Sequence, residues 1–295
     1  MTEAPLGGEQ IDQHAVLVET EQQYQFSSLN TLDRRKLYSY SVPPFDIYSE
    51  MVLTLQLEGH ESVAEIGCGD PEFLKKLWQK SDFFGKMVGI DKYPFTYFSA
   101  EGTAEREAPG RVSFLEDDAM QLDTIDDDTF DVGAEVMLSY HLPDPIKALV
   151  ELRRVVKPGG LVLVATRGTG NQERLWRYND KICRSLGVIG ASSFYERFDV
   201  EKAEEVLPDI FSSPIRDSFV QRRPDYYLRI PATGWDDYER ALLSLRDNMQ
   251  PPPSSGDMFG YIAKEIKPEF DEEVEKSGYF TETVEQSFSV LVNGK

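Results

Sequence analysis

Cysteine, histidine and basic residues are scarce in this sequence of 295 residues. Its two cysteines, Cys68 and Cys183, are too few for a disulfide framework, and its three histidines are far apart in the chain. This composition predicts no metal site. No apolar run approaches the length of a membrane span, and the polar first residues lack the pattern of a signal peptide. We therefore expect a cytoplasmic protein without a membrane span.

The sequence is strongly acidic. It has 31 Lys and Arg residues against 52 Asp and Glu residues, which gives a formal net charge of −21. A charge of this sign repels phosphate backbones and anionic membrane surfaces at long range. Nucleic acid and membranes are therefore poor candidates as partners, whereas a small-molecule ligand is compatible with the charge, and so is an oligomer.

Short apolar runs alternate with helical patterns through the first half of the chain. Strands are predicted over residues 62–66, 87–90, 112–115, 130–136 and 161–165, and helices over 71–80, 95–106 and 144–156. Strand–helix alternation of this kind predicts an α/β fold with a parallel sheet. Further helices are predicted over 171–186, 200–207 and 235–249, and the alternation in 284–292 predicts a strand that closes one edge of the sheet.

A glycine turn follows the first predicted strand. The strand ends in Glu65, and Gly67-Cys68-Gly69 leads into the next helix. Such a turn brings backbone amides and a helix N-terminus close to a ligand, although it also occurs where strand and helix simply pack tightly. The second strand ends in Asp91, where a carboxylate can accept hydrogen bonds from both hydroxyls of a ribose.

An acidic segment ends the third strand. Asp118, followed by Ala119, can accept a hydrogen bond from an adenine amino group, and its alternative role is in a surface turn or a helix cap. A dinucleotide is disfavoured, because Pro71 and Phe73 interrupt the third-glycine pattern that seats a pyrophosphate.

These motifs together resemble those of the class I S-adenosylmethionine-dependent methyltransferases, in particular the small-molecule "type 11" branch. The resemblance spans roughly residues 32–200 and includes the turn at 65–69, Asp91, Asp118-Ala119, the fourth-strand segments 130–132 and 137–141, and the junction 152–160. It implies S-adenosylmethionine as the cofactor. It also implies a Rossmann-like three-layer sandwich with a seven-stranded, mostly parallel sheet whose last strand is antiparallel, together with a helical N-terminal cap and a C-terminal insertion.

The expected organisation has four parts. Residues 1–23 form a flexible leader, and residues 24–60 form the helical cap. Residues 61–170 form the core that binds S-adenosylmethionine. Residues 171–295 contain the remaining core elements and an insertion on the substrate side.

The resemblance also implies the residues of the site. Tyr38, with one of the arginines before it, is expected to hold the carboxylate of the cofactor. Cys68 lies between two turn glycines without a catalytic histidine motif, so we interpret it as a turn residue rather than a nucleophile. The full set of expected cofactor-binding residues is Tyr38, Glu65, Gly67, Cys68, Gly69, Asp91, Lys92, Asp118, Ala119 and Glu135.

Methyl transfer from a sulfonium is an in-line displacement, which requires orientation and desolvation more than catalytic side chains. His141, just after the fourth strand, is the candidate general base for a hydroxyl acceptor, and its alternative role is packing or positioning. The sequence therefore predicts methylation of a small organic acceptor. Two alternatives stay open, namely an RNA or protein methyltransferase and a catalytically silent protein that binds the cofactor.

Overall fold

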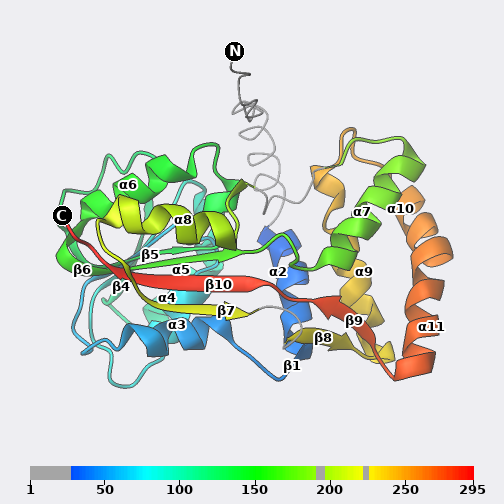
Figure 1. Ribbon diagram of the computed structural model, residues 1–295, viewed down its shortest axis with the longest axis horizontal. Coiled ribbons are helices and arrows are strands. Elements are labelled where there is room, and N and C mark those ends of the chain that lie inside the picture. The colour runs from blue at the N-terminus through cyan, green and yellow to red at the C-terminus, as the bar shows by residue number, and fades with distance from the viewer. Residues whose placement is uncertain (1–27, 191–196, 222–225) are drawn as a thin grey trace, which may run out of the picture.

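A seven-stranded sheet forms the centre of the computed structural model, which describes residues 28–190, 197–221 and 226–295 (Figure 1). The expected leader at residues 1–23 lies outside this range. The strand order is β4-β3-β2-β5-β6-β10-β7. The bounds are β2 (Val63–Ile66), β3 (Met87–Asp91), β4 (Val112–Glu116), β5 (Phe130–Val136), β6 (Val156–Arg167), β7 (Ile215–Gln221) and β10 (Gln286–Val292). Strand β10 runs antiparallel to both of its neighbours, whereas β2 to β6 are parallel.

Helices cover both faces of this sheet and produce two apolar cores. One face is covered by α3 (Ile47–Leu55), α4 (Glu72–Trp78) and α5 (Phe98–Glu107), and the other by α6 (Pro145–Val155) and α8 (Val200–Phe211) (Figure 1). Short 3₁₀ turns η2 (Pro94–Thr96) and η3 (Ser139–His141) follow β3 and β5. This arrangement is the predicted Rossmann-like sandwich with its antiparallel strand.

The prediction of a closing edge strand near residues 284–292 is wrong. Strand β10 lies between β6 and β7, and β7 forms the edge. The prediction missed β7 because its sequence, IRDSFVQ, mixes charged and apolar residues without a clear alternation. Strand β6 is also longer than the predicted 161–165, since it begins at Val156 and includes the Pro158-Gly159-Gly160 junction.

A second, smaller unit lies beside the sheet (Figure 1). It contains α2 (Ser28–Lys36), η1 (Leu37–Tyr40), α7 (Glu173–Leu186), η5 (Ala232–Gly234), α9 (Trp235–Leu243), η6 (Arg246–Asn248), α10 (Ser255–Tyr261), the π-helical segment η7 (Ile262–Ile266) and α11 (Lys267–Ser277). Its three-stranded antiparallel sheet joins β1 (Ser41–Val42), β8 (Tyr227–Ile230) and β9 (Phe280–Thr283). None of the helices in the described ranges is both long and apolar enough to cross a bilayer.

Hydrogen bonds fasten the N-terminal segment to this C-terminal unit. The Arg34 guanidinium donates to the Ser244 hydroxyl at 3.1 Å, and the Tyr40 hydroxyl donates to Asp237 at 2.7 Å. The Arg34 side chain is buried, so this contact is shielded from competing water. Segments about 200 residues apart in sequence therefore form one wall beside the sheet.

Glu282 joins β9 to the N-terminus of α7. Its buried carboxylate accepts hydrogen bonds from the backbone amides of Arg174 at 3.1 Å and Leu175 at 2.9 Å, and from the Tyr238 hydroxyl at 3.0 Å. The first amides of a helix have no partners within the helix, so a carboxylate there satisfies them and favours the positive end of the helix dipole. Glu282 therefore fixes where α7 begins relative to β9.

We expect Glu282→Gln to destabilise the fold by about 1–3 kcal/mol. The glutamine side chain would place its own N–H donors opposite the backbone N–H donors of α7, and it would remove the negative charge at the helix N-terminus. The free energy of unfolding from urea denaturation measures this loss. Glu272→Gln is the matched control, since that side chain is exposed and pairs only across the surface with Lys276. Equal stabilities of the two variants would contradict the capping role.

Candidate functional site

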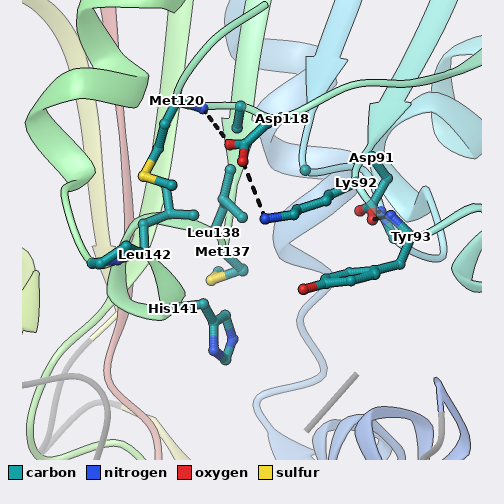
Figure 2. Close-up of a pocket in the computed structure, with 13 residues that line it drawn as sticks. Asp91, Lys92, Tyr93, Asp118, Met120, Met137, Leu138, His141 and Leu142 are labelled. Carbon is teal, nitrogen blue, oxygen red and sulfur yellow. Dashed lines mark hydrogen bonds and ion pairs between the residues drawn. The ribbon is translucent and has the colours of Figure 1, made fainter. Parts of the chain in front are cut away.

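A cavity opens at the carboxyl ends of β2, β3, β4 and β5, with about 680 Å³ of space including its mouth (Figure 2). In an open parallel sheet, this edge is where ligands bind. We call it the sheet-edge cavity. It is lined by Gly67, Gly69, Asp91, Lys92, Tyr93, Asp118, Ala119, Met120, Met137, Leu138, His141, Leu142 and Pro143.

The glycine turn forms one wall of the sheet-edge cavity, and its two positions favour glycine for different structural reasons. Gly67 has a φ of 62°, and a Cβ there would lie 2.4 Å from the Leu138 side chain. Gly69 has a φ of 48°, but a Cβ there would meet nothing within 4 Å. The first glycine therefore allows close packing against the segment after β5, whereas the second leaves open space beside the backbone.

Asp91 is held at the end of β3 by two backbone amides. Its carboxylate accepts hydrogen bonds from Gly69 at 2.8 Å and from Tyr93 at 2.9 Å. Burial raises the pKa of Asp91, while these amides favour its ionised form. Each carboxylate oxygen has lone pairs beyond the one used, so Asp91 can still accept from a diol in the cavity.

Asp118 and Lys92 point toward each other in the wall of the sheet-edge cavity (Figure 2). One Asp118 oxygen accepts from the Met120 amide at 2.9 Å, and the other lies 3.2 Å from the Lys92 ammonium. Both the turn role and the ligand-facing role considered for Asp118 are therefore compatible with its position. A ligand amino group that bonds to Asp118 would share the carboxylate with Lys92.

His141 lies at the lower end of the cavity in Figure 2, near Met137. Its side chain is 8% exposed, and its ring lies 4.4 Å from the ring of Tyr140. Burial, with added repulsion from Arg167, Arg34 and Arg197, holds the pKa of His141 well below its usual range. The imidazole is therefore neutral near pH 7 and able to accept a proton.

Met137, which also lines the sheet-edge cavity, has an unusual backbone conformation. Its φ is 58°, in the left-handed region that residues with a Cβ rarely adopt. The strain turns the chain sharply at the end of β5, so that the following residues run along the cavity. Such strain persists only where contacts with the surrounding structure hold the residue in that conformation, and it is common at binding sites.

Two buried carboxylates, Glu65 and Glu135, do not line the sheet-edge cavity. They lie on opposite faces of the sheet, because Glu65 is in register with Ala134 and Glu135 with Ile66. Burial raises the pKa of Glu65 well above its usual range and that of Glu135 to about 7. Each carboxylate has one oxygen without a hydrogen-bond partner among the described residues, and Ser139 donates to the other oxygen of Glu135.

The remaining expected residues divide between two places. The Cys68 side chain is buried beside Gly89, as expected of a turn residue, and burial raises the pKa of its thiol well above the usual range. Tyr38 lies outside the sheet-edge cavity and lines a second one. Among the described residues, no cluster of His, Cys, Asp and Glu side chains has the arrangement of a metal site.

This second cavity, here called the arginine cavity, is lined by Leu32, Arg35, Lys36, Tyr38, Ser39, Ser41, Phe45, Asp46, Ile47, Tyr48, Glu72, Arg167 and Gln286. It lies between the N-terminal segment and the ends of β6 and β10. Arg35 pairs with Glu72 at 3.0 Å and Asp70 at 3.5 Å, directly after the glycine turn.

Six residues of the sheet-edge cavity are absent from the expected set: Tyr93, Met120, Met137, Leu138, Leu142 and Pro143. Each follows a predicted site residue by one to three positions, and Met137 and Leu138 also lie in the 137–141 segment that carries the resemblance. The pattern gives no means of telling which of two adjacent side chains turns inward. It also gave no indication that Arg167, at the end of β6, lies in the second cavity.

Comparison with known proteins identifies a methyltransferase domain in part of this chain. A family model described as "Methyltransferase domain" matches residues 64–164, which include β2 to β5 and most of β6. A probable methyltransferase, ltbC, of Aspergillus luteorubrus is 34% identical over 39% of this chain and 45% of its own. A demethylmenaquinone methyltransferase of Lactococcus lactis is 28% identical over 50% of this chain and 60% of its own. The chain thus spans about half the length of these relatives.

Solved structures share the fold. A methyltransferase structure from Bacillus halodurans has a TM-score of 0.57 at 15% identity, and covers 84% of this chain and 99% of its own. A phosphoethanolamine-type N-methyltransferase of Haemonchus contortus, solved with S-adenosylhomocysteine, has a TM-score of 0.54 at 15% identity. The match covers 94% of this chain and 59% of the Haemonchus chain. By its matched model, the segment 64–164 is a methyltransferase domain, and the strand order is that of the class I S-adenosylmethionine-dependent methyltransferase fold, whose cofactor is S-adenosylmethionine.

Proposed function

We propose that this protein transfers the methyl group of S-adenosylmethionine to a small organic acceptor. The observation that carries the proposal is the sheet-edge cavity, where an open glycine turn and two carboxylates, Asp91 and Asp118, face the same space. Support for a small acceptor comes from the net charge of −21, which disfavours nucleic acid, and from a relative named for demethylmenaquinone.

The residues of the cavity fit the cofactor. In this proposal Asp91 accepts from the ribose hydroxyls, Asp118 and Ala119 border the adenine, and the open backbone at Gly69 admits the nucleoside. The free oxygen of Glu65 and the neighbouring Arg35 would face the ammonium and carboxylate of the methionine part, with Tyr38 beside them. Lys92, Cys68 and Glu135 complete the proposed surroundings.

When bound, the cofactor supplies an electrophilic methyl group on a sulfonium. The protein holds the acceptor in line with that methyl and excludes water, which accounts for most of the rate enhancement that such a displacement needs. For a hydroxyl acceptor, His141 would take the proton, since its neutral imidazole borders the cavity. The apolar side chains of Met137, Leu138 and Leu142 would keep this space dry.

Cofactor binding is tested by thermal unfolding with S-adenosylmethionine, S-adenosylhomocysteine or NAD. At about a hundred times its dissociation constant, a specific ligand should add about 2.7 kcal/mol to the free energy of unfolding. We expect both sulfur nucleosides to stabilise the protein and NAD to have no effect. Asp91→Ala should weaken the response, because it removes the ribose acceptor.

The matched control is Asp180→Ala, which removes an exposed carboxylate on α7 outside both cavities. Its response to the sulfur nucleosides should equal that of the natural protein. A response to NAD alone would overturn the proposal. Binding of the sulfur nucleosides without turnover of any acceptor would instead favour a silent cofactor-binding protein.

The base role predicts the pH dependence of kcat with a hydroxyl acceptor. Because the pKa of His141 is lowered, the imidazole stays neutral and kcat should be constant between about pH 6.5 and 8. It should fall only when more acidic solution protonates the imidazole. In His141→Gln, kcat should drop by about a hundredfold or more at neutral pH and rise as alkaline solution ionises the acceptor.

Steady-state rates across this pH range measure the effect. S-adenosylhomocysteine affinity serves as the control, because loss of the base alone should leave it unchanged. If His141→Gln keeps the natural rate and pH profile, His141 is a packing residue.

A further inference from the structure

The arginine cavity has the features of a binding site for an anion. Two arginines reach it from different elements, Arg35 from α2 and Arg167 from the end of β6. The Arg167 side chain is 8% exposed and lines the cavity. The wall also contains the carboxylates of Asp46 and Glu72, and Arg35 pairs with Glu72, so Arg167 is the better candidate for binding an anion.

Aromatic faces accompany these cations. The Arg167 guanidinium lies 5.6 Å from the ring centre of Tyr38, and the Arg35 guanidinium lies 5.8 Å from that of Tyr48. Phe45, also in the wall, stacks on Phe219 at 4.9 Å, which fixes its ring. Flat rings held in place by neighbours suit a planar organic body, whereas the guanidinium groups suit the charged oxygens attached to it.

A buried hydroxyl in the wall supplies an independent observation. Ser41 is 7% exposed, lines the cavity, and its hydroxyl has no hydrogen-bond partner among the described residues. A buried hydroxyl without a partner carries a desolvation penalty, which a ligand oxygen would remove. Ser41 and Arg167 therefore point to the same kind of ligand.

The arginine cavity adjoins the proposed site of methyl transfer. The Arg167 guanidinium lies 6.0 Å from the ring centre of Tyr140, and that ring lies 4.4 Å from the ring of His141, which lines the sheet-edge cavity. On the opposite side, Arg35 pairs with Asp70, the residue directly after Gly69. A molecule in the arginine cavity would thus lie beside the reacting end of the sheet-edge cavity.

We propose that Arg167, with the Ser41 hydroxyl, holds an anionic oxygen group of the methyl acceptor, while Arg35 serves the cofactor, so that this enzyme selects planar organic anions. This inference rests on the proposed function and names the acceptor class. The Arg167 guanidinium binds the anion, and the rings of Tyr48 and Phe45 contact its flat body. Arg167 then determines specificity and takes no part in the bond that forms to carbon, oxygen or nitrogen.

The probe pair 2-naphthoate and 2-naphthamide tests charge selection, because the two molecules share shape and differ in charge. Calorimetric titration of the protein, with and without saturating S-adenosylhomocysteine, gives both affinities. We expect 2-naphthoate to bind about tenfold more tightly than the amide. Arg167→Gln should abolish this preference, Arg167→Lys should retain part of it, and Arg184→Gln, an exposed arginine on α7, should leave it intact.

A second measurement shows whether Arg167 binds an anionic group of the acceptor or the carboxylate of the cofactor. S-adenosylhomocysteine carries a carboxylate, whereas 5′-methylthioadenosine lacks the whole amino-acid part. If Arg167 serves the acceptor, Arg167→Gln should leave the affinity ratio of these two nucleosides unchanged. Selective weakening of S-adenosylhomocysteine would assign Arg167 to the cofactor and overturn the inference.

The remaining outcomes are also decisive. Equal binding of naphthoate and naphthamide, no binding of naphthoate at millimolar concentration, or an undiminished preference in Arg167→Gln would overturn the acceptor class. Failure of the natural protein to bind either nucleoside would overturn the proposed function instead. The titration of naphthoate alone still reports on the arginine cavity in that case.

Discussion

The hydrogen bond from the Gly69 amide to the Asp91 carboxylate is the constraint on which the sheet-edge cavity depends. It joins the turn after β2 to the end of β3 at 2.8 Å, and the Cys68 amide adds a second link to the Ile90 carbonyl at 3.0 Å. Because β2 pairs with β5 as well as with β3, these links also fix the position of the turn relative to the end of β5. The open space at Gly69 and the close contact of Gly67 with Leu138 follow from that position of the turn.

Charge is divided between the two cavities. Asp91 and Asp118 face the sheet-edge cavity, where the proposed ligand carries a positive sulfonium, whereas Arg35 and Arg167 face the arginine cavity. Opposite fields on neighbouring sites favour the approach of a cationic donor and an anionic acceptor and disfavour their exchange. Arg167 also lowers the pKa of His141, so one side chain affects both orientation and proton transfer in the proposed reaction.

Residues near the glycine turn could be predicted from sequence because their roles depend on local geometry. A glycine pair after a strand and an acid at the end of the next strand have one plausible arrangement in a parallel sheet, which the structure places as expected. Tyr38 and Arg167 are different, since their meeting depends on how an N-terminal segment packs against the end of β6, 129 positions later. Strand β7 was missed for a similar reason, because its place at the edge is set by pairing with β10 and not by its own pattern.

The position of β10 inside the sheet has a consequence for the order in which the fold can assemble. Strand β7 pairs with β10 and with no other described strand of the large sheet, and β6 has β10 as its neighbour on that side. On a ribosome, β6, β7 and the whole unit of β8, β9 and α9 to α11 are synthesised before β10 exists. Until then β6 presents an open edge and β7 has no partner strand, so this side of the sheet is completed only when the last strand has been synthesised.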